Sequence, residues 1–148
     1  MSEHKANVQW ARGKNEFNHE SYNRDHAVTY ESGIEIKASA APAFHGNPDY
    51  VDPEEALVGA LSSCHMLTFL AIAAKKRLTV ESYEDDAVGF LEKNGDGRMA
   101  VTRATLRPKV VWGGDKTPTS EEIEKIHEKA HQACFIANSV LTAVTIES

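Results

Sequence analysis

One stretch of the chain, from Asp52 to Leu78, is apolar over most of its length and polar only near its two ends. Asp52 is a helix-capping residue type, and Pro53 suits the first position of a helix. The cations Lys75 to Arg77 favour the negative end of a helix dipole. Because no charged residue lies between Ala56 and Ala74, the pattern predicts a central helix that is buried on most of its surface.

Outside this helix, apolar and polar residues alternate in the manner of strands. The predicted strand segments are His4–Trp10, Ala27–Tyr30, Ile34–Ala38, Thr79–Leu91, Met99–Trp112 and Ser139–Ile146. The turn signal Asn94–Gly97 predicts a long antiparallel hairpin, in which Pro108 marks a bulge or an edge. The polar segments 11–24, 39–51 and 113–118 are predicted loops.

A second helix is predicted over Thr119–Ala133, where Thr119 and Glu122 have the spacing of a capping box. Apolar residues recur along it mostly at spacings of three and four, so one stripe faces the core. Cys134 lies at or just past its end. Strands, a long helix, a long hairpin, a helix and a strand predict an α+β fold, and we expect one domain over residues 1–148.

Composition narrows the possible partners and location of the protein. The nineteen residues 56–74 reach the lower limit for a membrane span, but Gly59, His65 and other polar residues interrupt them, and the rest of the chain is strongly polar. We therefore expect no membrane partner. A net charge of −6 argues against nucleic acid. The polar start, Met1 to Lys14, indicates no signal peptide, so we expect a cytoplasmic protein without a structural disulfide.

Two cysteines then become candidates for chemistry, since both lie on the apolar side of a predicted helix. A peroxide reductase needs one thiolate to attack the O–O bond and a second thiol to condense with the resulting sulfenic acid. Cys64 and Cys134 are of the right type, although their separation of 70 residues (134 − 64) leaves contact undetermined by spacing. The simpler interpretation is that both cysteines are buried apolar side chains that only pack in the core.

The motif Asp-Pro-Glu-Glu-x8-Cys (Asp52 to Cys64), with a later helix ending His-Gln-Ala-Cys (His131 to Cys134), resembles the OsmC/Ohr family. This family comprises the osmotically inducible and organic hydroperoxide resistance proteins, which are thiol-dependent peroxidases. The resemblance includes the opening His4–Trp10 and the ending Ser139–Ile146. It implies a fold of antiparallel sheets around a long central buried helix, in an intertwined homodimer. It also implies no cofactor and no metal, an organic hydroperoxide substrate, an external dithiol reductant, and a role in oxidative or osmotic stress defence.

The resemblance also implies a role for individual residues. Cys64 matches the peroxidatic cysteine, and Cys134 matches the resolving one. Glu54 matches the glutamate that partners the family's arginine, for which Arg24 is the best match and Arg12 the rival. Ten residues of straight helix span about 15 Å, so Glu54 cannot reach Cys64 along its own helix. Either the helix is broken or the glutamate comes from a second chain, which favours the dimer.

Several alternatives remain open at this point. The family usually has proline after the second cysteine, and Phe135 stands there. A pocket lining is expected from Leu61, Leu67, Phe69 and Phe135, which would favour organic peroxides. A different class of function is a non-catalytic module that binds a small apolar ligand at the dimer interface.

Three histidines carry their own alternatives. His127, His131 and Cys134 have a spacing that allows metal binding, although two histidines on the partly exposed rim of the helix are the simpler interpretation. His65 points about 100° away from Cys64 on an ideal helix, so we expect it to pack rather than to act as a base.

Overall fold

The computed structural model describes residues 1–148, which form two compact units, Met1–Ala56 and Leu57–Ser148. The first unit contains strands β1 (Ala6–Gln9), β2 (His26–Tyr30) and β3 (Glu35–Ala38), the short 3-10 helix η1 (Pro42–Phe44) and the start of helix α1 (Pro53–Lys75). The second contains the rest of α1, strands β4 (Thr79–Asp85), β5 (Val88–Lys93), β6 (Met99–Leu106) and β7 (Pro108–Gly113), helix α2 (Ser120–Ala133), the 3-10 helix η2 (Ala137–Ser139) and strand β8 (Ala143–Ile146).

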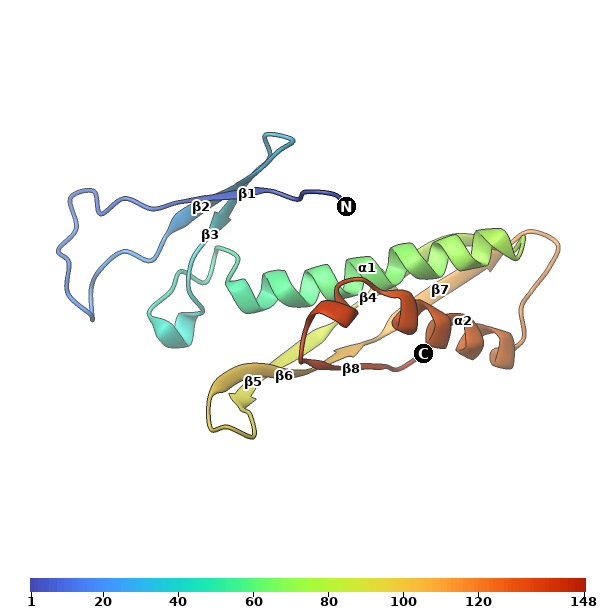
Figure 1. The fold of residues 1–148 in the computed structure, drawn as a ribbon. Helices are drawn as coiled ribbons and strands as arrows, with labels where there is room; N and C mark the ends of the chain where they lie inside the picture. Colours follow the sequence, from blue (N-terminus) through green and yellow to red (C-terminus); the bar gives the residue numbers. More distant parts are fainter. The chain divides into compact units, whose positions relative to one another are not determined.

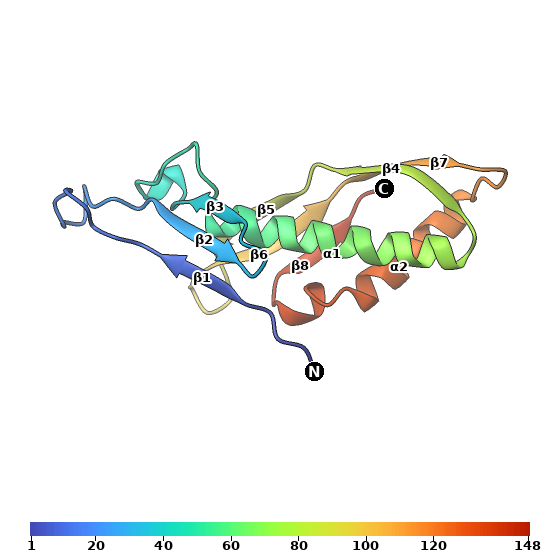
Figure 2. The ribbon, with the colours of Figure 1, turned by 90° about the horizontal axis from the view of Figure 1, so that it is seen from above.

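The first unit is a three-stranded antiparallel sheet with β2 between β1 and β3, as Figure 2 shows. The predicted turn between β2 and β3 is confirmed. Gly33 has a φ of 87°, a left-handed conformation that glycine adopts without strain, and its N–H donates to the carbonyl of Tyr30 at 2.9 Å. Of the predicted loops, residues 11–24 connect β1 with β2, and residues 39–51 follow β3.

Helix α1 has the two ends that its sequence predicted. Asp52 accepts a hydrogen bond from the N–H of Glu55 at 2.8 Å, and Glu55 accepts one from the N–H of Asp52 at 3.1 Å. This reciprocal capping box satisfies two N–H groups at the start of the helix. At the other end, Arg77 takes a left-handed φ of 60° and the N–H of Leu78 returns to the carbonyl of Ala73 at 3.0 Å, which closes the helix.

The predicted hairpin is confirmed but is divided into two antiparallel ladders. Strands β5 and β6 pair next to the turn, and β4 pairs with β7 further along. Pro108 is the first residue of β7, where it opens the second ladder opposite Asp85, because a proline is tolerated at the start of a strand. The last strand is shorter than predicted, and β8 pairs in parallel with β6 rather than antiparallel.

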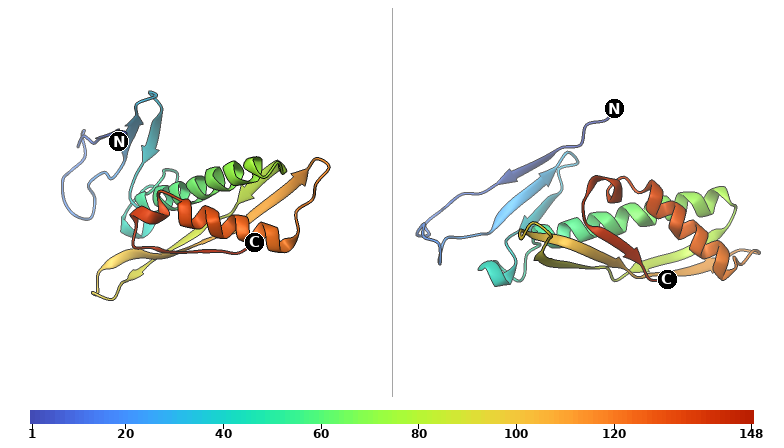
Figure 3. Two further views of the ribbon diagram at one scale, coloured as in Figure 1. Left: turned by 45° about the vertical axis from the view of Figure 1, so that its right-hand side comes forward. Right: turned by 60° about the horizontal axis from the view of Figure 1, so that its bottom comes forward.

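Helices α1 and α2 lie side by side on one face of the strands in the second unit (Figures 1 and 3). Their shared core contains Phe69, Ala73, Leu78, Ile126 and Ala130, with residues of β4 and β7 packed against it. The predicted α+β fold is confirmed. Phe69 anchors this core, since its ring lies 5.8 Å from that of Trp112 on β7.

Only one face of α1 is buried within the chain. The buried residues are Leu61, His65, Phe69 and Ala73, which follow each other at intervals of four. The expectation of burial over most of the helix surface is therefore met on this face alone, since one layer of strands and one helix cover a single side. By length and composition α1 also qualifies as a membrane span, a property that the core helices of soluble proteins share.

Candidate active site

The structure brings Cys64 and Cys134 together, although 70 residues (134 − 64) separate them in the chain. Cys64 lies midway along α1 and is half-buried. Cys134 is the residue that ends α2, and its side chain is 1% exposed. Both are free thiols, and they interact directly with each other. The packing of α2 against α1 therefore supplies the contact that spacing could not predict.

The chain makes a tight turn immediately after Cys134. The backbone of Cys134 leaves the helical conformation at φ −69° and ψ 113°. The N–H of Asn138 then returns to the carbonyl of Cys134 at 3.0 Å, and the N–H of Ala137 donates to its sulfur at 3.4 Å. The turn thus folds the backbone around the sulfur atoms.

The surroundings of Cys64 favour its thiolate. Burial raises the pKa of the Cys64 thiol, but hydrogen bonds from the backbone N–H of Ile136, the thiol of Cys134 and the backbone N–H of Phe135, with a smaller effect of the nearby Thr68 hydroxyl, outweigh it. The net effect lowers the pKa of Cys64 below its usual value. A lower pKa increases the fraction of the nucleophilic form at neutral pH.

Cys134 is shifted in the opposite direction. Burial raises the pKa of the Cys134 thiol, and the neighbouring Cys64 raises it further, while the N–H groups of Ala137 and Ile136 only partly offset them. Two interacting thiols cannot both ionise easily, because the second charge would form beside the first. The pair therefore divides into a readily ionised Cys64 and a protonated Cys134.

The residue after Cys64 forms a second contact between the helices. His65 and His127 are 1% and 4% exposed, and their Nε2 and Nδ1 atoms are 2.9 Å apart. The rings are nearly parallel, with centroids 5.2 Å apart. Burial, followed by the nearby His127, lowers the pKa of His65 to about 4, so both rings are neutral near pH 7. The expectation that His65 packs is confirmed.

This pairing corrects the prediction for His127, which is buried in the helix contact rather than placed on the rim. The apolar stripe of α2 continues through this position because His65 supplies the polar partner that a buried imidazole needs. No group of three His, Cys, Asp or Glu side chains is arranged to hold a metal ion. His127, His131 and Cys134 therefore do not form the metal site that their spacing allowed.

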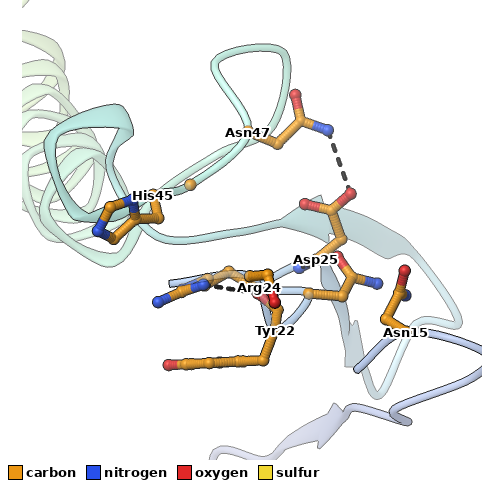
Figure 4. A pocket seen from close by; sticks show the side chains of 9 residues that line it. Asn15, Tyr22, Arg24, Asp25, His45 and Asn47 are labelled. Atoms are coloured by element: carbon orange, nitrogen blue, oxygen red, sulfur yellow. Dashed lines mark hydrogen bonds between the residues drawn. The ribbon is translucent and has the colours of Figure 1, made fainter. Parts of the chain in front are cut away.

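Arg24 lines a polar cavity of about 490 Å³ that lies within the first unit (Figure 4). Its guanidinium lies 3.6 Å from the centroid of the Tyr22 ring and donates to the carbonyls of Tyr22 at 2.6 Å and His19 at 2.5 Å. On the far side of the cavity, Asn47 donates to Asp25 at 3.2 Å. The cavity is lined by Asn15, Ser21, Tyr22, Asn23, Arg24, Asp25, His45, Gly46 and Asn47.

The predicted pairing of Arg24 with Glu54 does not occur within this unit. Glu54 lies in the first turn of α1, and Arg24 forms no ion pair with any carboxylate. The rival Arg12 is exposed and donates to the carbonyl of Asn15 at 3.1 Å in a local turn. Arg24, and not Arg12, is therefore the arginine that borders the cavity.

The expected apolar pocket lining is wrong for two of its four residues. Leu61 and Phe69 are 1% and 0% exposed, so they belong to the core and cannot contact a substrate. Leu67 and Phe135 are exposed. The correction follows from the helix geometry, because Leu61, His65 and Phe69 share the buried face of α1 whereas Leu67 lies on the opposite one.

Sequence reasoning missed the donors that surround Cys64. Thr68 had a usable signal, since a residue four positions after Cys64 lies on the same helical face. Its hydroxyl donates to the carbonyl of Cys64 at 2.8 Å and lies close to the thiol. The N–H groups of Phe135 and Ile136 had no such signal in the sequence, because the side chain of a residue does not report where its backbone amide points.

Comparison with known proteins identifies the family and the fold of the chain. The model of the family described as OsmC-like protein matches residues 46–148. An OsmC-like protein of unknown function from Vibrio cholerae is 51% identical, with a TM-score of 0.94 over 99% of both chains. The uncharacterized protein YmaD of Bacillus subtilis is 25% identical over 127 residues, which are 84% of each chain.

Two further solved structures share the fold at low identity. An organic hydroperoxide resistance protein from Elizabethkingia anophelis has a TM-score of 0.73 at 18% identity, over 100% of this chain and 97% of its own. The organic hydroperoxide resistance protein OhrB of Bacillus subtilis has a TM-score of 0.69 at 16% identity, over 99% and 97%. With the family match over residues 46–148, these findings establish that the chain belongs to the OsmC-like protein family.

Proposed function

We propose that this protein is a thiol-dependent peroxidase that reduces organic hydroperoxides. The observation that carries the proposal is the contact between Cys64 and Cys134, in which the pKa of Cys64 is lowered and that of Cys134 is raised. A peroxidase with two cysteines needs two thiols of different pKa. One must be ionised to attack the peroxide, and the other must remain available to react with the sulfenic acid. Membership of a family that includes organic hydroperoxide resistance proteins supports the choice of substrate.

The reaction proceeds in three balanced steps. The thiolate of Cys64 attacks the terminal oxygen of the hydroperoxide and the O–O bond breaks, so that Cys64 becomes a sulfenic acid. The alkoxide that leaves takes a proton from water and becomes the alcohol. The thiol of Cys134 then attacks this sulfur, and a disulfide and one water form. An external dithiol, of the kind available in the cytoplasm, reduces the disulfide and is itself oxidised.

The adjacency of the two sulfurs suits the second step. In this fold the thiol of Cys134 already interacts with Cys64 before any oxidation. The disulfide therefore forms with a short movement of the turn after α2 and without unfolding of the helix.

A homodimer completes the proposed site. Helix α1 is unbroken from Pro53 to Lys75, so about 15 Å of helix separate Glu54 from Cys64. Of the two explanations that the sequence left open, a broken helix is excluded, and we propose that Glu54 of one chain acts beside the thiol of the other. Arg24, which lacks a carboxylate partner in its own unit, would pair with Glu54 and help to orient the peroxide.

The uncovered face of α1 supports a second copy as the partner. Within the second unit this face carries small and apolar residues at helical spacing, namely Gly59, Ala60, Ser63, Leu67, Ala71 and Ala74, all exposed. Small residues allow two helices to approach closely, and apolar surface of this kind is stabilised by burial. Light scattering should therefore give the mass of two chains, and Leu67→Glu should shift it toward one.

Peroxide consumption tests the proposed reaction directly. Cumene hydroperoxide should be reduced rapidly by the protein with a dithiol present, and Cys64→Ser should abolish the reaction. Cys134→Ser should stop after one turnover with a sulfenic acid that dimedone traps. If the native protein with both thiols free consumes no hydroperoxide, the proposal is wrong, and the non-catalytic module that binds a small apolar ligand becomes the better interpretation.

The two arginines provide a matched pair for the remaining assignment. Arg24→Ala should lower kcat/KM at least tenfold, because a charge that orients the peroxide is lost. Arg12→Ala should have little effect, since its side chain is fully outside the cavity. Equal losses in the two variants would contradict the assignment of Arg24.

A further inference from the structure

We propose that the turn after α2 is part of the reactive centre, and that the backbone N–H groups of Phe135 and Ile136 hold the negative charge of the Cys64 sulfur. The inference rests on the proposed function in one respect, namely that an ionised Cys64 is the attacking group. It assigns the stabilisation of that ion to the main chain beside Cys134, in addition to any side chain of a partner.

The hydrogen bonds of the turn leave these two amides free. Helix α2 ends with the N–H of Cys134 donating to His131 at 3.4 Å, and backbone bonding resumes at Asn138 and Ser139. The amide of Ala137 is taken by the sulfur of Cys134. Neither Phe135 nor Ile136 donates to a backbone carbonyl in this turn. A main-chain N–H without such a partner needs another acceptor. Both amides face the sulfur of Cys64, and that of Ile136 also lies close to the sulfur of Cys134.

The chemistry of these donors suits an anion better than a neutral thiol. A neutral sulfur is a weak acceptor, whereas hydrogen bonds to an ionised group are roughly twice as strong as neutral ones. Fixed backbone N–H groups need no rearrangement when charge develops, which is how they stabilise anions in other active sites. The thiol of Cys134, which also lowers the pKa of Cys64, is a hydrogen-bond donor as well.

The same turn therefore serves both sulfurs. The amide of Phe135 faces Cys64, that of Ala137 faces Cys134, and that of Ile136 lies between them and contacts both sulfurs. The docking of α2 on α1 positions the turn, and the neighbouring contact of His65 with His127 is part of that docking. Activation of Cys64 and placement of Cys134 consequently depend on one structural element.

Proline removes one of these donors without disturbing the chain. The φ of −69° and ψ of 113° at Cys134 lie in the extended region that a residue before proline prefers. Phe135→Pro therefore deletes the N–H and the ring, while the matched control Phe135→Ala deletes the ring alone. Both are made with Cys134→Ser, which leaves a single thiol to titrate and keeps a hydroxyl donor beside it.

The readout is the ionisation of Cys64, followed by thiolate absorbance and by the rate of alkylation with iodoacetamide across pH. We expect Phe135→Pro to raise the midpoint by about one pH unit and to slow alkylation at neutral pH about five- to tenfold. Phe135→Ala should stay close to the parent. Circular dichroism and thermal unfolding establish that both variants fold. The same midpoint in folded Phe135→Pro and Phe135→Ala would overturn the inference.

A second variant covers the case in which proline impairs folding. Residues 134–148 begin with a cysteine, so a synthetic peptide of this segment can be ligated to residues 1–133 to give the full chain. Phenyllactic acid in place of Phe135 replaces the N–H by an ester oxygen and keeps the ring. Both ligated chains keep Cys134, so the alkylation of Cys64 is followed on its own peptide by mass spectrometry. We expect the same upward shift of the Cys64 midpoint against the ligated parent, and an unchanged midpoint would overturn the inference.

These titrations contain no peroxide, so their result is independent of turnover. A shifted midpoint in a protein that consumes no hydroperoxide supports the amide assignment and contradicts the peroxidase. An unshifted midpoint in a protein with rapid turnover supports the peroxidase and contradicts the amide assignment.

Discussion

Two polar pairs cross the contact between α1 and α2, and they begin on adjacent residues. Cys64 meets Cys134 near the end of α2, and His65 meets His127 about two turns earlier. The histidines are enclosed on all sides, with the ring of Phe69 4.4 Å from that of His127. Cys134 lies where α2 ends, and Cys64 lies beside it on α1. Cys64 is therefore only half-buried, and main-chain N–H donors are within reach of its sulfur.

This difference in surroundings decides the chemistry of each pair. Burial lowers the pKa of both imidazoles, because the interior disfavours their charged form, and the nearby carboxylate of Asp85 offsets only part of this effect on the pKa of His65. Burial also opposes ionisation of Cys64, but there the hydrogen-bond donors of the turn prevail. One pair is therefore held neutral and stabilises the helix contact, while in the other Cys64 ionises more readily than Cys134.

The largest expected effect is the loss of stability in acid. The pKa of His65 is about 4 in the folded chain and 6.5 in the unfolded chain, so between these values the unfolded chain binds a proton that the folded chain does not. Stability from this residue is fully present above pH 6.5 and is lost as the pH falls toward 4. The difference corresponds to at most about 3 kcal/mol. Urea unfolding at fixed protein concentration, from about pH 7.5 to about pH 4.5, measures it.

A comparison of variants separates this contribution from that of other groups. His65→Leu combined with His127→Leu should have a shallower pH dependence, because no buried base remains to be protonated. His4→Gln, a change at an exposed histidine, should keep the native slope. If the double variant has the same pH dependence as the native protein, the buried pair is not what senses acid.

The next largest effect comes from breaking the pair at neutral pH. His127→Leu leaves the Nε2 of His65 buried without a partner, and an unpaired polar group of this kind costs about 1–3 kcal/mol. Adding His65→Leu removes the unpaired atom, so the double variant should recover part of the loss, and the coupling should be at least about 0.5 kcal/mol. Urea unfolding near pH 7.5 measures both.

The half-buried His131 provides the control on the same helix. His131→Leu removes an imidazole whose Nδ1 has no partner, so it should change stability by about 0.5 kcal/mol or less. If the effects of His65→Leu and His127→Leu on the free energy of unfolding are additive, with no coupling energy, a direct interaction between His65 and His127 is contradicted.

The sequence predicted the elements better than the contacts between them. The ends of α1 followed from Asp52, Pro53 and the closing cations, because capping depends on residues that are neighbours in the chain. The hairpin followed from Asn94–Gly97 for the same reason. The parallel pairing of β8 with β6 did not, since alternation reports a strand and its buried side but not the direction of its partner.

The same difference between local features and long-range contacts holds for the candidate site. Cys64 and Cys134 could be proposed from residue type and family resemblance, whereas their contact required the packing of two helices. His127 was misread because an imidazole on a helix face suits either a rim or a buried pair, and only the presence of His65 opposite distinguishes the two. Backbone donors such as the amide of Ile136 are beyond any reading of side chains.

Removing the thiol of Cys134 should have a smaller effect, confined to reactivity. Its S–H is one of the donors that lower the pKa of Cys64, so Cys134→Ala should slow the alkylation of Cys64 at neutral pH about three- to fivefold. Cys134→Ser keeps a hydroxyl in the same place and should react nearly as fast as the native Cys64. Equal rates in the alanine and serine variants would contradict a hydrogen bond from Cys134 to the thiolate.

The smallest effect is expected at Thr68, whose hydroxyl hydrogen serves the carbonyl of Cys64 at 2.8 Å and cannot be donated to the sulfur at the same time. Thr68→Val keeps the shape and removes the hydroxyl, so alkylation of Cys64 at neutral pH should slow only about twofold. Thr68→Ser retains the donor and should match the native rate. A loss in Thr68→Val as large as that in Phe135→Pro would mean that a side chain, rather than the turn after α2, is the main support of the thiolate.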